Sequence, residues 1–494
     1  MIIGRKTELQ RLEKIYKSKE AEFVVLYGRR RIGKTFLIRE FFKTKPAVFF
    51  QVTGSQKGTL KKQLAHFSES FSQVFTEGAE MKPLESWEEA FKTLTKFIEA
   101  REIKEITKKT EEKIVIFLDE LPWLATARSG ILEALDYYWN HHWSRHSNII
   151  LVVCGSSASW LIKNIIYNSG GLHNRCTAEM KLSPFNLAET EEFLRSREIK
   201  LKRGQILELY MALGGVPYYL SYVEKGLTAT ENIQKILCDI NAPLLDEFTK
   251  LFKSLFKNAK AYQELIKIIA SKKEGVDRVS LEENSQCSPG GGRLSDQLEQ
   301  LEQTNFIISY TPWGKERGAY YKVIDEFCLF YLSWLESSKA KERLADFWAK
   351  QTQKPSYHVW AGYAFEAICR KHIGQIIAGL NLKSAESIST WRVSKNKKNV
   401  EQEDLELLAG AQIDLLIDRS DDAITLCEIK YTQAPFVIDK AYAEVLKRKI
   451  DVFKAVTKTH KEIFMALISA NGVKENKYSE DLISGVVTLE ALFG

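Results

Sequence analysis

One octapeptide, Gly28-Arg-Arg-Arg-Ile-Gly33-Lys34-Thr35, restricts the possible folds of this chain more than any other segment. The apolar run FVVLY precedes it and the run FLIREFF follows it, so it joins an expected strand to an expected helix. Glycines in such a loop let backbone N–H groups surround phosphate oxygens at the helix N-terminus. Lys34 then reaches the β- and γ-phosphates, and the Thr35 hydroxyl is a ligand for Mg²⁺. The motif predicts a site for ATP and Mg²⁺.

A pair of carboxylates supports the same interpretation. The apolar run 114–118 ends at Asp119 and Glu120. In enzymes with this phosphate-binding loop, such an aspartate supports the Mg²⁺ ion, and the adjacent glutamate orients or deprotonates the attacking water. Asp119 is therefore assigned to the metal site with Thr35, and Glu120 favours hydrolysis over binding alone. The alternative is an acidic pair that begins a solvated turn.

Two further positions are candidates for contacts with the γ-phosphate. The expected strand 148–154 runs into Ser156 and Ser157 at the C-terminal edge of the sheet, where open α/β folds bind ligands. Ser156 or Ser157 is a candidate sensor of the γ-phosphate, and an ordinary serine cap of a helix is the alternative. Arg175 lies in a polar turn and is a candidate phosphate-sensing or finger arginine. A solvated loop residue is the alternative for Arg175.

The first half of the chain alternates short β-rich runs with longer amphipathic stretches. Runs at 23–27, 48–52, 114–118 and 149–154 predict a parallel sheet with helices on both faces. From residue 188 to about 272, helical patterns replace strands and predict a helical subdomain. The length of 494 residues suggests roughly three domains at ~150 residues each. A composition of 45% hydrophobic and 27% charged residues excludes disordered and collagen-like chains.

The net charge and the cysteines further restrict the class of protein and its possible partners. A net charge of +7 over this length gives only weak support for polyanionic partners. The seven cysteines are scattered without a CxxC pair, which argues against a disulfide framework and a thiolate zinc site. The N-terminus lacks an apolar signal segment, and no apolar run approaches the ~18 residues that span a bilayer. We therefore expect a cytoplasmic protein with no membrane partner.

Residues 277–325 follow a different pattern. A helix, a glycine-rich turn (289–292), a second helix (293–303) and two β runs joined by a turn resemble the order of a winged helix. In DNA-binding examples the second helix enters the major groove. Here it carries three acidic residues and one arginine, which is a poor composition for contacting phosphates. Docking within the chain or on a partner is therefore favoured over DNA binding, although Lys315 and Arg317 are candidate phosphate contacts.

The last part of the chain returns to strand patterns, at 387–393, 411–419, 423–432, 462–470 and 485–492, with a helix expected at 437–456. Asp414 lies in the second strand, and Glu428 and Lys430 lie in the third. Residues two apart on a strand share a face, so Glu428 and Lys430 are expected to point the same way. Two carboxylates on adjacent strands form a hard-oxygen Mg²⁺ site, and a neighbouring ammonium group positions or activates water at a phosphodiester. An ion pair on an edge strand is the alternative.

Five sequence segments together resemble the archaeal-type AAA+ ATPases of the signal-transduction, STAND-like branch. They are IIGRKTEL, YGRRRIGKTFLI, FLDELPWL, CGSSASWL and GGVPYYL. The resemblance implies that the opening loop with Ile3, Gly4 and Arg5 lies by the adenine. It also implies that Pro217, in a Gly-x-Pro element, closes over the adenine. Without the family, GGVPYYL indicates only a helix end with a glycine cap and a proline stop.

The C-terminal segment resembles the PD-(D/E)xK, restriction-endonuclease-like nucleases, through Asp414, Glu428, Lys430 and the order of its elements. This resemblance implies that Glu366, on an expected helix at 360–371, is an additional acidic metal ligand. Ile413 stands where the family's nominal proline precedes the aspartate. Nuclease-like domains also keep their shape for binding alone, so cleavage and binding both stay open.

The expected fold is α/β. It comprises a P-loop AAA+ parallel sheet (1–185), a helical lid (186–255), a winged helix (256–326), a helical linker (327–355) and a restriction-endonuclease-like domain (356–494). The predicted function is a switch that binds and hydrolyses Mg-ATP and controls a nuclease-like domain acting on nucleic acid, with DNA the expected type. A nucleotide-dependent homo-oligomer is an expected assembly. The alternatives are a signalling or scaffold ATPase whose C-terminal domain binds a partner, and a DNA-binding ATPase without nuclease activity.

Overall fold

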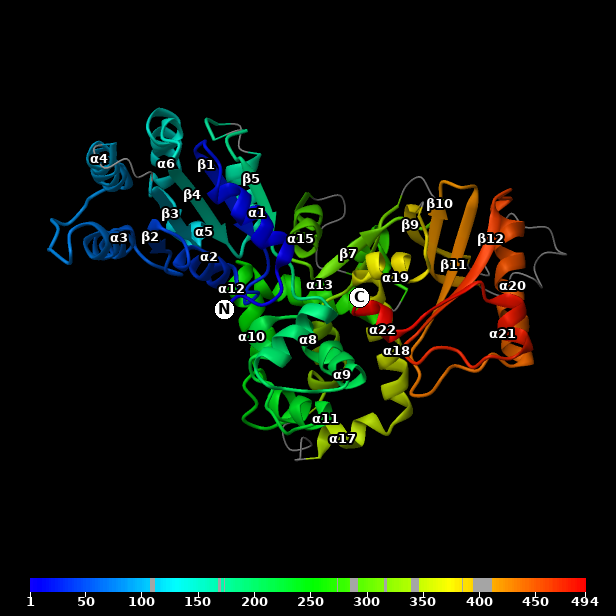
Figure 1. The fold of residues 1–494 in the computed structure, drawn as a ribbon. Coiled ribbons are helices and arrows are strands. Elements are labelled where there is room, and N and C mark those ends of the chain that lie inside the picture. The colour runs from blue at the N-terminus through cyan, green and yellow to red at the C-terminus, as the bar shows by residue number, and fades with distance from the viewer. Residues whose placement is uncertain are drawn as a thin grey trace. The chain divides into compact units, whose positions relative to one another are not determined.

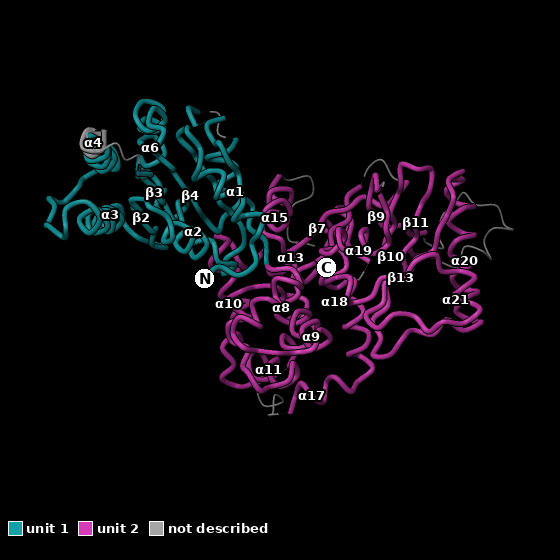
Figure 2. The backbone as a smooth tube through the Cα atoms, viewed as in Figure 1, with its two compact units in different colours: residues 1–184 teal, residues 185–494 magenta. Residues whose placement is uncertain are grey.

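The structure is a computed structural model of the 494-residue chain. The residues that it describes are 1–106, 112–167, 170–172, 174–272, 274–284, 292–314, 318–338, 346–383, 385–393 and 411–494. The chain forms two compact units, residues 1–184 and 185–494, which Figure 2 shows in different colours. The first unit ends one residue before the end expected for the ATPase segment. The four segments expected after it all belong to the second unit.

The first unit contains a five-stranded parallel sheet with the strand order β2-β3-β4-β1-β5 (Figure 1). Its strands are β1 (Glu22–Tyr27), β2 (Ala47–Thr53), β3 (Lys113–Asp119), β4 (Ile149–Gly155) and β5 (Ala178–Lys181). Alternate side chains of β1 enter different cores, with Phe23 and Val25 in one and Val24 and Leu26 in the other. Burial on both faces explains the nearly continuous apolar sequences of the central strands. The predicted parallel sheet is confirmed.

Helices cover both faces of this sheet. The core around Val24 and Leu26 includes α1 (Lys6–Tyr16) and α2 (Lys34–Lys43). The core around Phe23 and Val25 includes α3 (Leu60–Phe75), α4 (Trp87–Ile106) and α6 (Ile131–His141). Short segments complete the unit: α5 (Leu121–Leu124), the 3₁₀ turn η1 (Trp143–Arg145), α7 (Ala158–Leu161) and the π-helical turn η2 (Ile162–Ile166). The loop between β1 and α2 therefore lies at the carboxyl edge of a sheet that is packed on both sides.

The second unit begins with the predicted run of helices. They are α8 (Leu187–Ser196), α9 (Arg203–Leu213), α10 (Pro217–Leu220), α11 (Ala229–Ile233), the π-helical turn η3 (Gln234–Cys238) and α12 (Glu247–Leu255). Asn186 is the N-cap of α8 and forms a capping box with Glu189. The side chain of Asn186 accepts from the backbone N–H of Glu189, and the carboxylate of Glu189 accepts from the backbone N–H of Asn186. This capping box explains why the helical part of the unit begins directly after the boundary at residue 184.

A three-stranded antiparallel sheet follows, which we call the small sheet. Its strands are β6 (Val276–Asp277), β7 (Ile307–Tyr310) and β8 (Tyr320–Val323) in the order β6-β8-β7, accompanied by α13 (Ala259–Ser271), α14 (Arg278–Asn284) and α15 (Gly292–Gln303). The order α14, α15, β7, β8 agrees with the order expected from the sequence, whereas the short strand β6 was not expected. Residues 285–291 and 315–317, which include most of the glycine-rich turn as well as Lys315 and Arg317, lie outside the described residues.

A second five-stranded sheet, the C-terminal sheet, has the order β13-β12-β11-β10-β9. Its strands are β9 (Ala385–Arg392), β10 (Gln412–Arg419), β11 (Ala423–Lys430), β12 (Glu462–Ser469) and β13 (Gly485–Val487). The first three are antiparallel neighbours, and the last three are parallel. One face packs on α18 (Pro355–Lys371), α19 (Ile373–Gly379) and α22 (Leu489–Leu492), and the other on α20 (Lys440–Thr457) and α21 (Lys477–Leu482).

Two sequence expectations for the second unit need refinement. Residues 485–492 were expected to form one strand, but only β13 is extended and the helix α22 follows it. The reason is that Leu489 and Leu492 are buried in the same core at helical spacing. The expected linker contains α16 (Glu326–Phe330), the π-helical turn η4 (Tyr331–Leu335) and α17 (Phe347–Thr352). Its aromatic side chains belong to the main core of the unit.

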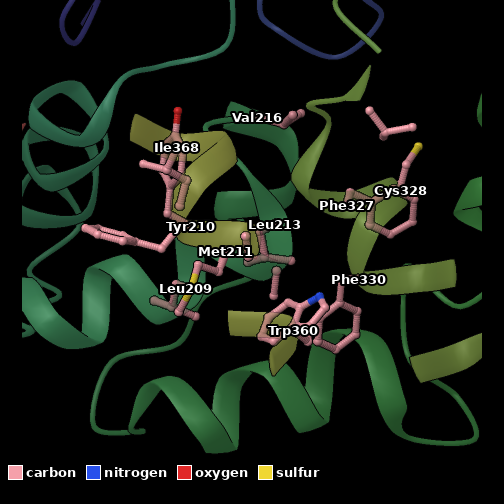
Figure 3. Close-up of a cluster of buried hydrophobic side chains, with 14 of the residues drawn as sticks. Leu209, Tyr210, Met211, Leu213, Val216, Phe327, Cys328, Phe330, Trp360 and Ile368 are labelled. Carbon is pink, nitrogen blue, oxygen red and sulfur yellow. The ribbon is translucent and has the colours of Figure 1, made fainter. Parts of the chain in front are cut away.

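One hydrophobic core joins the helices, the small sheet and the C-terminal sheet of the second unit. Figure 3 shows part of it, where Leu213 of α9, Phe330 of α16 and Trp360 of α18 lie close together. The rings of Phe330 and Trp360 meet edge to face with their centroids 5.7 Å apart. In the part of the chain that the structure describes, no helix is long and apolar enough to cross a membrane.

Candidate ATP site and C-terminal carboxylates

Two glycines shape the loop between β1 and α2. Gly28 has a φ of 150°, and a Cβ atom there would lie 2.2 Å from the carbonyl oxygen of Leu182. Gly33 has a φ of 91° and is the N-cap of α2, a conformation that glycine adopts without strain. The first N–H groups of a helix lack intrahelical acceptors and point outward from its N-terminus. The loop thus presents backbone donors to an anion at the carboxyl edge of the sheet.

Lys34, the first residue of α2, is buried and points back into its own loop. Its Nζ atom donates to the carbonyl oxygens of Gly28 at 2.9 Å and Arg29 at 3.0 Å. It also donates to Oγ of Ser156 at 3.1 Å. The ammonium group is therefore held inside the loop, where it is placed to meet phosphate charge.

Asp119 is the last residue of β3 and lies beside Thr35, the second residue of α2. The hydroxyl of Thr35 lies 3.0 Å from both carboxylate oxygens of Asp119. Burial raises the pKa of the Asp119 carboxyl, and the charge of Glu120 raises it further, while the hydrogen bond from Thr35 opposes the shift. A hydroxyl and a buried carboxylate are hard oxygen donors, and a divalent cation would offset the burial of the carboxylate. These two residues fit Mg²⁺, and their assignment as its ligands stays a prediction.

Glu120 contacts Ser156 through both of its carboxylate oxygens. The hydroxyl of Ser156 donates to Oε1 at 2.5 Å, and its backbone N–H donates to Oε2 at 3.0 Å. Glu120 itself has a φ of 52° and starts the short helix α5. Ser157, rather than Ser156, is the N-cap of α7, and its side chain makes no capping hydrogen bond. Ser156 therefore links Lys34 to Glu120, a contact that the sequence did not reveal.

Sequence reasoning also missed three polar residues beside Asp119. Gln51 and Thr53 of β2 lie 3.4 Å from Oδ2 of Asp119, and Arg39 of α2 donates to Oε1 of Gln51 at 2.6 Å. The available signal was the pair of polar residues, two apart, at the end of an otherwise apolar strand. Residues two apart share a face, and the ends of parallel strands meet at one edge of the sheet.

The opening loop is attached to the same region through Arg5. This buried residue donates to the carbonyl oxygens of Ser183 at 2.6 Å and Ile32 at 3.1 Å. Gly4 and Arg5 both have positive φ values, 64° and 58°. Arg5 thus ties the loop with Ile3 to the phosphate-binding loop. The adenine contacts expected of Ile3, Gly4 and Arg5 stay a prediction.

Arg175, an expected site residue, is not brought to this edge. Arg175 is exposed and precedes β5, and the N–H of Thr177 pairs with the carbonyl oxygen of Phe23 near the amino end of β1. The phosphate-binding loop follows the opposite end of that strand. Pro217, at the start of α10, belongs to the second unit. Its predicted role over the adenine stays a prediction.

Comparison with known proteins agrees with this geometry. Residues 2–223 match the model of a family described as an ATPase domain found predominantly in Archaea. The strand order and the loop after β1 give the first unit the P-loop AAA+ fold.

The chain is similar to two uncharacterized proteins and to several solved structures. One from Methanocaldococcus jannaschii is 24% identical over 379 residues, which are 76% of this chain and 77% of the relative. An uncharacterized ATP-binding protein of the same organism is 47% identical over 45 residues, which are 9% of this chain and 76% of that protein. The Walker-type ATPase of Pyrococcus abyssi has a TM-score of 0.45 at 18% identity and covers 67% of this chain and 96% of its own. The ORC2 protein of Aeropyrum pernix has a TM-score of 0.41 at 13% identity, with 75% and 95% covered.

In the second unit, Asp414 and Glu428 face each other on β10 and β11. Leu415 pairs with Cys427 in the antiparallel register, so Asp414 and Glu428, the next residues along the two strands, lie opposite each other. Oδ2 of Asp414 accepts from the N–H of Ile429 at 3.1 Å. Burial, together with the charges of Glu428 and Glu366, raises the pKa of Asp414 to about 6. The structure therefore brings two of the three expected C-terminal metal ligands together on neighbouring strands.

Glu428 is nearly fully buried and is surrounded by donors. Oε1 accepts from Nζ of Lys430 at 2.9 Å and from the hydroxyl of Tyr442 at 2.7 Å. Oε2 accepts from Nζ of Lys449 at 2.6 Å. Burial alone would raise the pKa of Glu428, but the charges of Lys449 and Lys430 outweigh burial and lower it. The prediction that Glu428 and Lys430 share a face is confirmed by their contact, and Lys449 of α20 is a further cationic partner of Glu428.

Glu366 of α18 is also held by cations. Its Oε1 accepts from Nζ of Lys322 at 2.6 Å and from a guanidinium nitrogen of Arg370 at 3.0 Å. Burial would raise the pKa of Glu366, but Lys322 and Arg370 lower it. Lys322 lies on β8 of the small sheet, in a segment that the sequence assigned to another domain. Glu366 thus joins two parts of the second unit through a buried ion pair.

These contacts bear on the expected metal set Glu366, Asp414 and Glu428. Among the described residues, no group of three or more His, Cys, Asp or Glu side chains is arranged to hold a metal ion. The physical reason is that ammonium and guanidinium groups already neutralise Glu366 and Glu428. In this conformation the residues do not fit a metal ion, and the metal site stays a prediction that requires these cations to move.

Proposed function

We propose that the chain binds and hydrolyses ATP with Mg²⁺ and uses this cycle to control its C-terminal part. The observation that carries the proposal is the convergence of Lys34, Asp119 and Glu120 at one edge of the parallel sheet. Each of the three has a partner suited to its role: loop carbonyls for Lys34, Thr35 for Asp119 and Ser156 for Glu120.

Each side chain has a distinct part in hydrolysis. Lys34 meets the charge of the β- and γ-phosphates, and Thr35 and Asp119 would hold the Mg²⁺ ion, which neutralises phosphate charge. Glu120 orients or deprotonates the attacking water, and for this it must release at least one bond from Ser156. A γ-phosphate supplies the reason for that release, because its oxygens compete for the Lys34 ammonium group and the Ser156 hydroxyl.

The direct test is phosphate release by purified full-length protein with Mg-ATP. Lys34→Ala removes the charge that meets the phosphates, so ATP binding weakens and hydrolysis stops. Lys43→Ala is the matched control, because Lys43 ends the same helix with an exposed side chain. Turnover in Lys34→Ala equal to that in Lys43→Ala would contradict the proposal.

For the C-terminal part we propose an action on nucleic acid, with DNA the expected type. The pair Asp414 and Glu428, with Lys430 on the same face, supports this proposal. Because cations neutralise Glu428, no metal-dependent step is assigned to this conformation. Cleavage would first require Lys449 to leave Glu428.

A second candidate function, binding of a partner without cleavage, is favoured by a separate observation. The segment between β7 and β8 docks on the C-terminal sheet, where the N–H of Trp313 donates to the carbonyl oxygen of Thr390 at 2.9 Å. The indole N–H of Trp313 also donates to Asp418 at 3.0 Å. This docking engages part of the turn that a winged helix presents to DNA.

Incubation with plasmid, Mg²⁺ or Mn²⁺ and ATP separates the two candidates. Nicking that disappears in Asp414→Ala would support a nuclease. Absence of nicking under every metal and nucleotide condition would favour binding alone.

We also propose that Arg175 acts on a second copy of the chain in a nucleotide-dependent homo-oligomer. Its position near the amino end of β5, away from the loop of its own chain, supports this role. Arg175→Ala should lower turnover without lowering ATP affinity. Mixing it with Lys34→Ala protein should restore activity, because each variant supplies what the other lacks. Failure of the mixture to regain activity would count against a role between copies.

A further inference from the structure

A groove of about 660 Å³ lies along β2, the edge strand of the parallel sheet in the first unit (Figure 1). Its lining includes Phe49, Gln51 and Thr53, alternate residues of β2 whose side chains share one face. Residues of α2 and α3 complete the lining. These two helices pack on opposite faces of the sheet, so a groove lined by both passes around the open edge of β2. The groove therefore exposes the edge of the strand.

The backbone groups at this edge have no partners among the described residues. The N–H of Gly54 donates to the carbonyl oxygen of Asp119 at 2.8 Å, so Gly54 and the alternate residues before it point their backbone groups toward β3. The residues between them, Phe49, Gln51 and Thr53, point theirs toward the groove. In the part of the chain that the structure describes, β2 has no second neighbour and no hydrogen bond reaches these outward groups. Such a row of donors and acceptors is a template for another strand.

The two walls of the groove carry opposite charges. On the α2 side, Arg39 and Lys43 both have exposed side chains. Nε of Arg39 donates to Gln51 at 2.6 Å, which leaves the two terminal nitrogens of Arg39 without a partner in the described chain. The ammonium group of Lys43 lies 3.9 Å from the carboxylate of Glu40. Glu69, the one acidic residue among the described lining residues, lies on the α3 side. A strand in the groove would meet positive charge on one face and negative charge on the other.

The spacing of the two cations matches that of an extended chain. Arg39 and Lys43 are four residues apart on one helix, which separates them by about 6 Å along the helix axis. Side chains two residues apart on a strand share a face and are separated by about 6.7 Å. Two acidic residues at alternate positions of a strand can therefore reach both cations. The positions between them face Glu69, which favours neutral or basic side chains there.

We propose that this edge binds an extended acidic segment of another protein, which adds to β2 as a further strand and places alternate carboxylates on Arg39 and Lys43. The backbone hydrogen bonds supply affinity, and the alternation of charge supplies specificity. A second copy of this chain is a less suitable occupant. In an antiparallel pair of two β2 strands the same faces adjoin, so Arg39 and Lys43 of both copies would come together, and like charges repel.

Fluorescein-labelled peptides of seven residues, the length of β2, test the proposal by fluorescence anisotropy with the full chain. One peptide alternates glutamate with threonine, and a second alternates lysine with threonine. We expect the glutamate peptide to bind about tenfold or more tightly, because two ion pairs replace two contacts between like charges. The glutamate peptide methylated at every backbone nitrogen should not bind, because it lacks the donors of a strand.

These titrations use the unchanged protein, so no variant has to fold for the proposal to be tested. No binding of the glutamate peptide, equal affinity for the glutamate and lysine peptides, or undiminished binding of the methylated peptide would each overturn the proposal. If sedimentation shows a dimer and the glutamate peptide does not bind to it, the edge is assigned to a second copy and the proposal is wrong. Peptide binding is measured without ATP, so the result is independent of the proposed ATPase function.

A charge reversal assigns the binding to this groove. The double variant Arg39→Glu/Lys43→Glu should reverse the preference, so that the lysine peptide binds more tightly than the glutamate peptide. Lys92→Glu/Lys96→Glu is the matched control, because it changes two exposed lysines at the same spacing on α4, outside the groove. A preference for the glutamate peptide that persists in Arg39→Glu/Lys43→Glu, or that falls equally in the control, would overturn the proposal.

Discussion

The hydroxyl of Ser156 donates to Oε1 of Glu120 across 2.5 Å, and the backbone N–H of the same serine donates to Oε2 across 3.0 Å. The hydroxyl also accepts from Lys34 at 3.1 Å. One serine thus connects the side chain expected to meet phosphate with the side chain expected to activate water. This arrangement allows the two functions to be separated by substitution.

Ser156→Ala should impair turnover more than binding. Lys34 keeps its two carbonyl partners, whereas Glu120 loses its hydroxyl donor and its defined orientation. We expect kcat to fall about 10- to 100-fold, as for a misplaced catalytic group, with little change in ATP affinity. Ser157→Ala is the control, since the Ser157 side chain makes no capping bond. Steady-state phosphate release compares the two, and equal rates would remove Ser156 from the mechanism.

Glu120→Gln should bind ATP but hydrolyse it slowly. The amide keeps the size of the side chain and loses its basicity, while Thr35 and Asp119 stay intact. Turnover should fall by about 10²- to 10⁴-fold, the usual contribution of a general base. Binding of a fluorescent ATP analogue, measured beside phosphate release, checks this. Parallel loss of binding and hydrolysis would instead assign Glu120 a structural role.

Lys449→Met should destabilise the second unit because it removes a cation from the buried Glu428. Loss of one partner of a buried pair usually costs ~3–5 kcal/mol. Lys430 still contacts Glu428, so we expect about 2–4 kcal/mol. Lys447→Met is the control on the same helix, where an exposed pair with Glu444 at 3.8 Å contributes less than about 1 kcal/mol. Denaturant unfolding followed by circular dichroism measures both, and equal effects would show that the Glu428 pair is not buried in solution.

Asp414→Asn should stabilise the protein near neutral pH. The folded state raises the pKa of Asp414 from 3.8 to about 6, so the folded chain binds this proton more tightly than the unfolded chain. The wild type therefore loses stability as the pH rises from about 4 to 6. Asn carries no such charge, so the advantage of Asp414→Asn should grow by roughly 1–3 kcal/mol across this window and then level off. Thermal melts at several pH values test this, and a difference independent of pH would contradict it.

The convergence of Lys34, Thr35 and Asp119 in the candidate ATP site was predictable because these residues are close in sequence or are brought together by the sheet. Lys34 and Thr35 belong to one octapeptide. Asp119 ends β3, whose apolar sequence predicts a strand. The carboxyl ends of parallel strands meet at one edge, so these residues converge without knowledge of any side-chain contact. The bond between Ser156 and Glu120 was not predictable, because two rotamers decide it.

The C-terminal site was less predictable because distant cations determine its state. Asp414 and Glu428 were placed correctly on neighbouring strands. Lys322 and Lys449, which neutralise Glu366 and Glu428, come from a small-sheet strand and from α20. A sequence pattern shows which residues are charged but not which of them meet across a core. Two of the three expected metal ligands, Glu366 and Glu428, are therefore found in ion pairs.

The core shared by all parts of the second unit decides how this protein can be divided. Helix α18 begins at Pro355, close to an expected domain border, yet Trp360 packs on α16 and Glu366 pairs with the small sheet. A fragment that starts at Pro355 would expose an aromatic surface and leave the carboxylate of Glu366 without Lys322. We therefore expect this fragment to aggregate rather than fold. A fragment that keeps this core intact has to include all the parts of the second unit, residues 185–494.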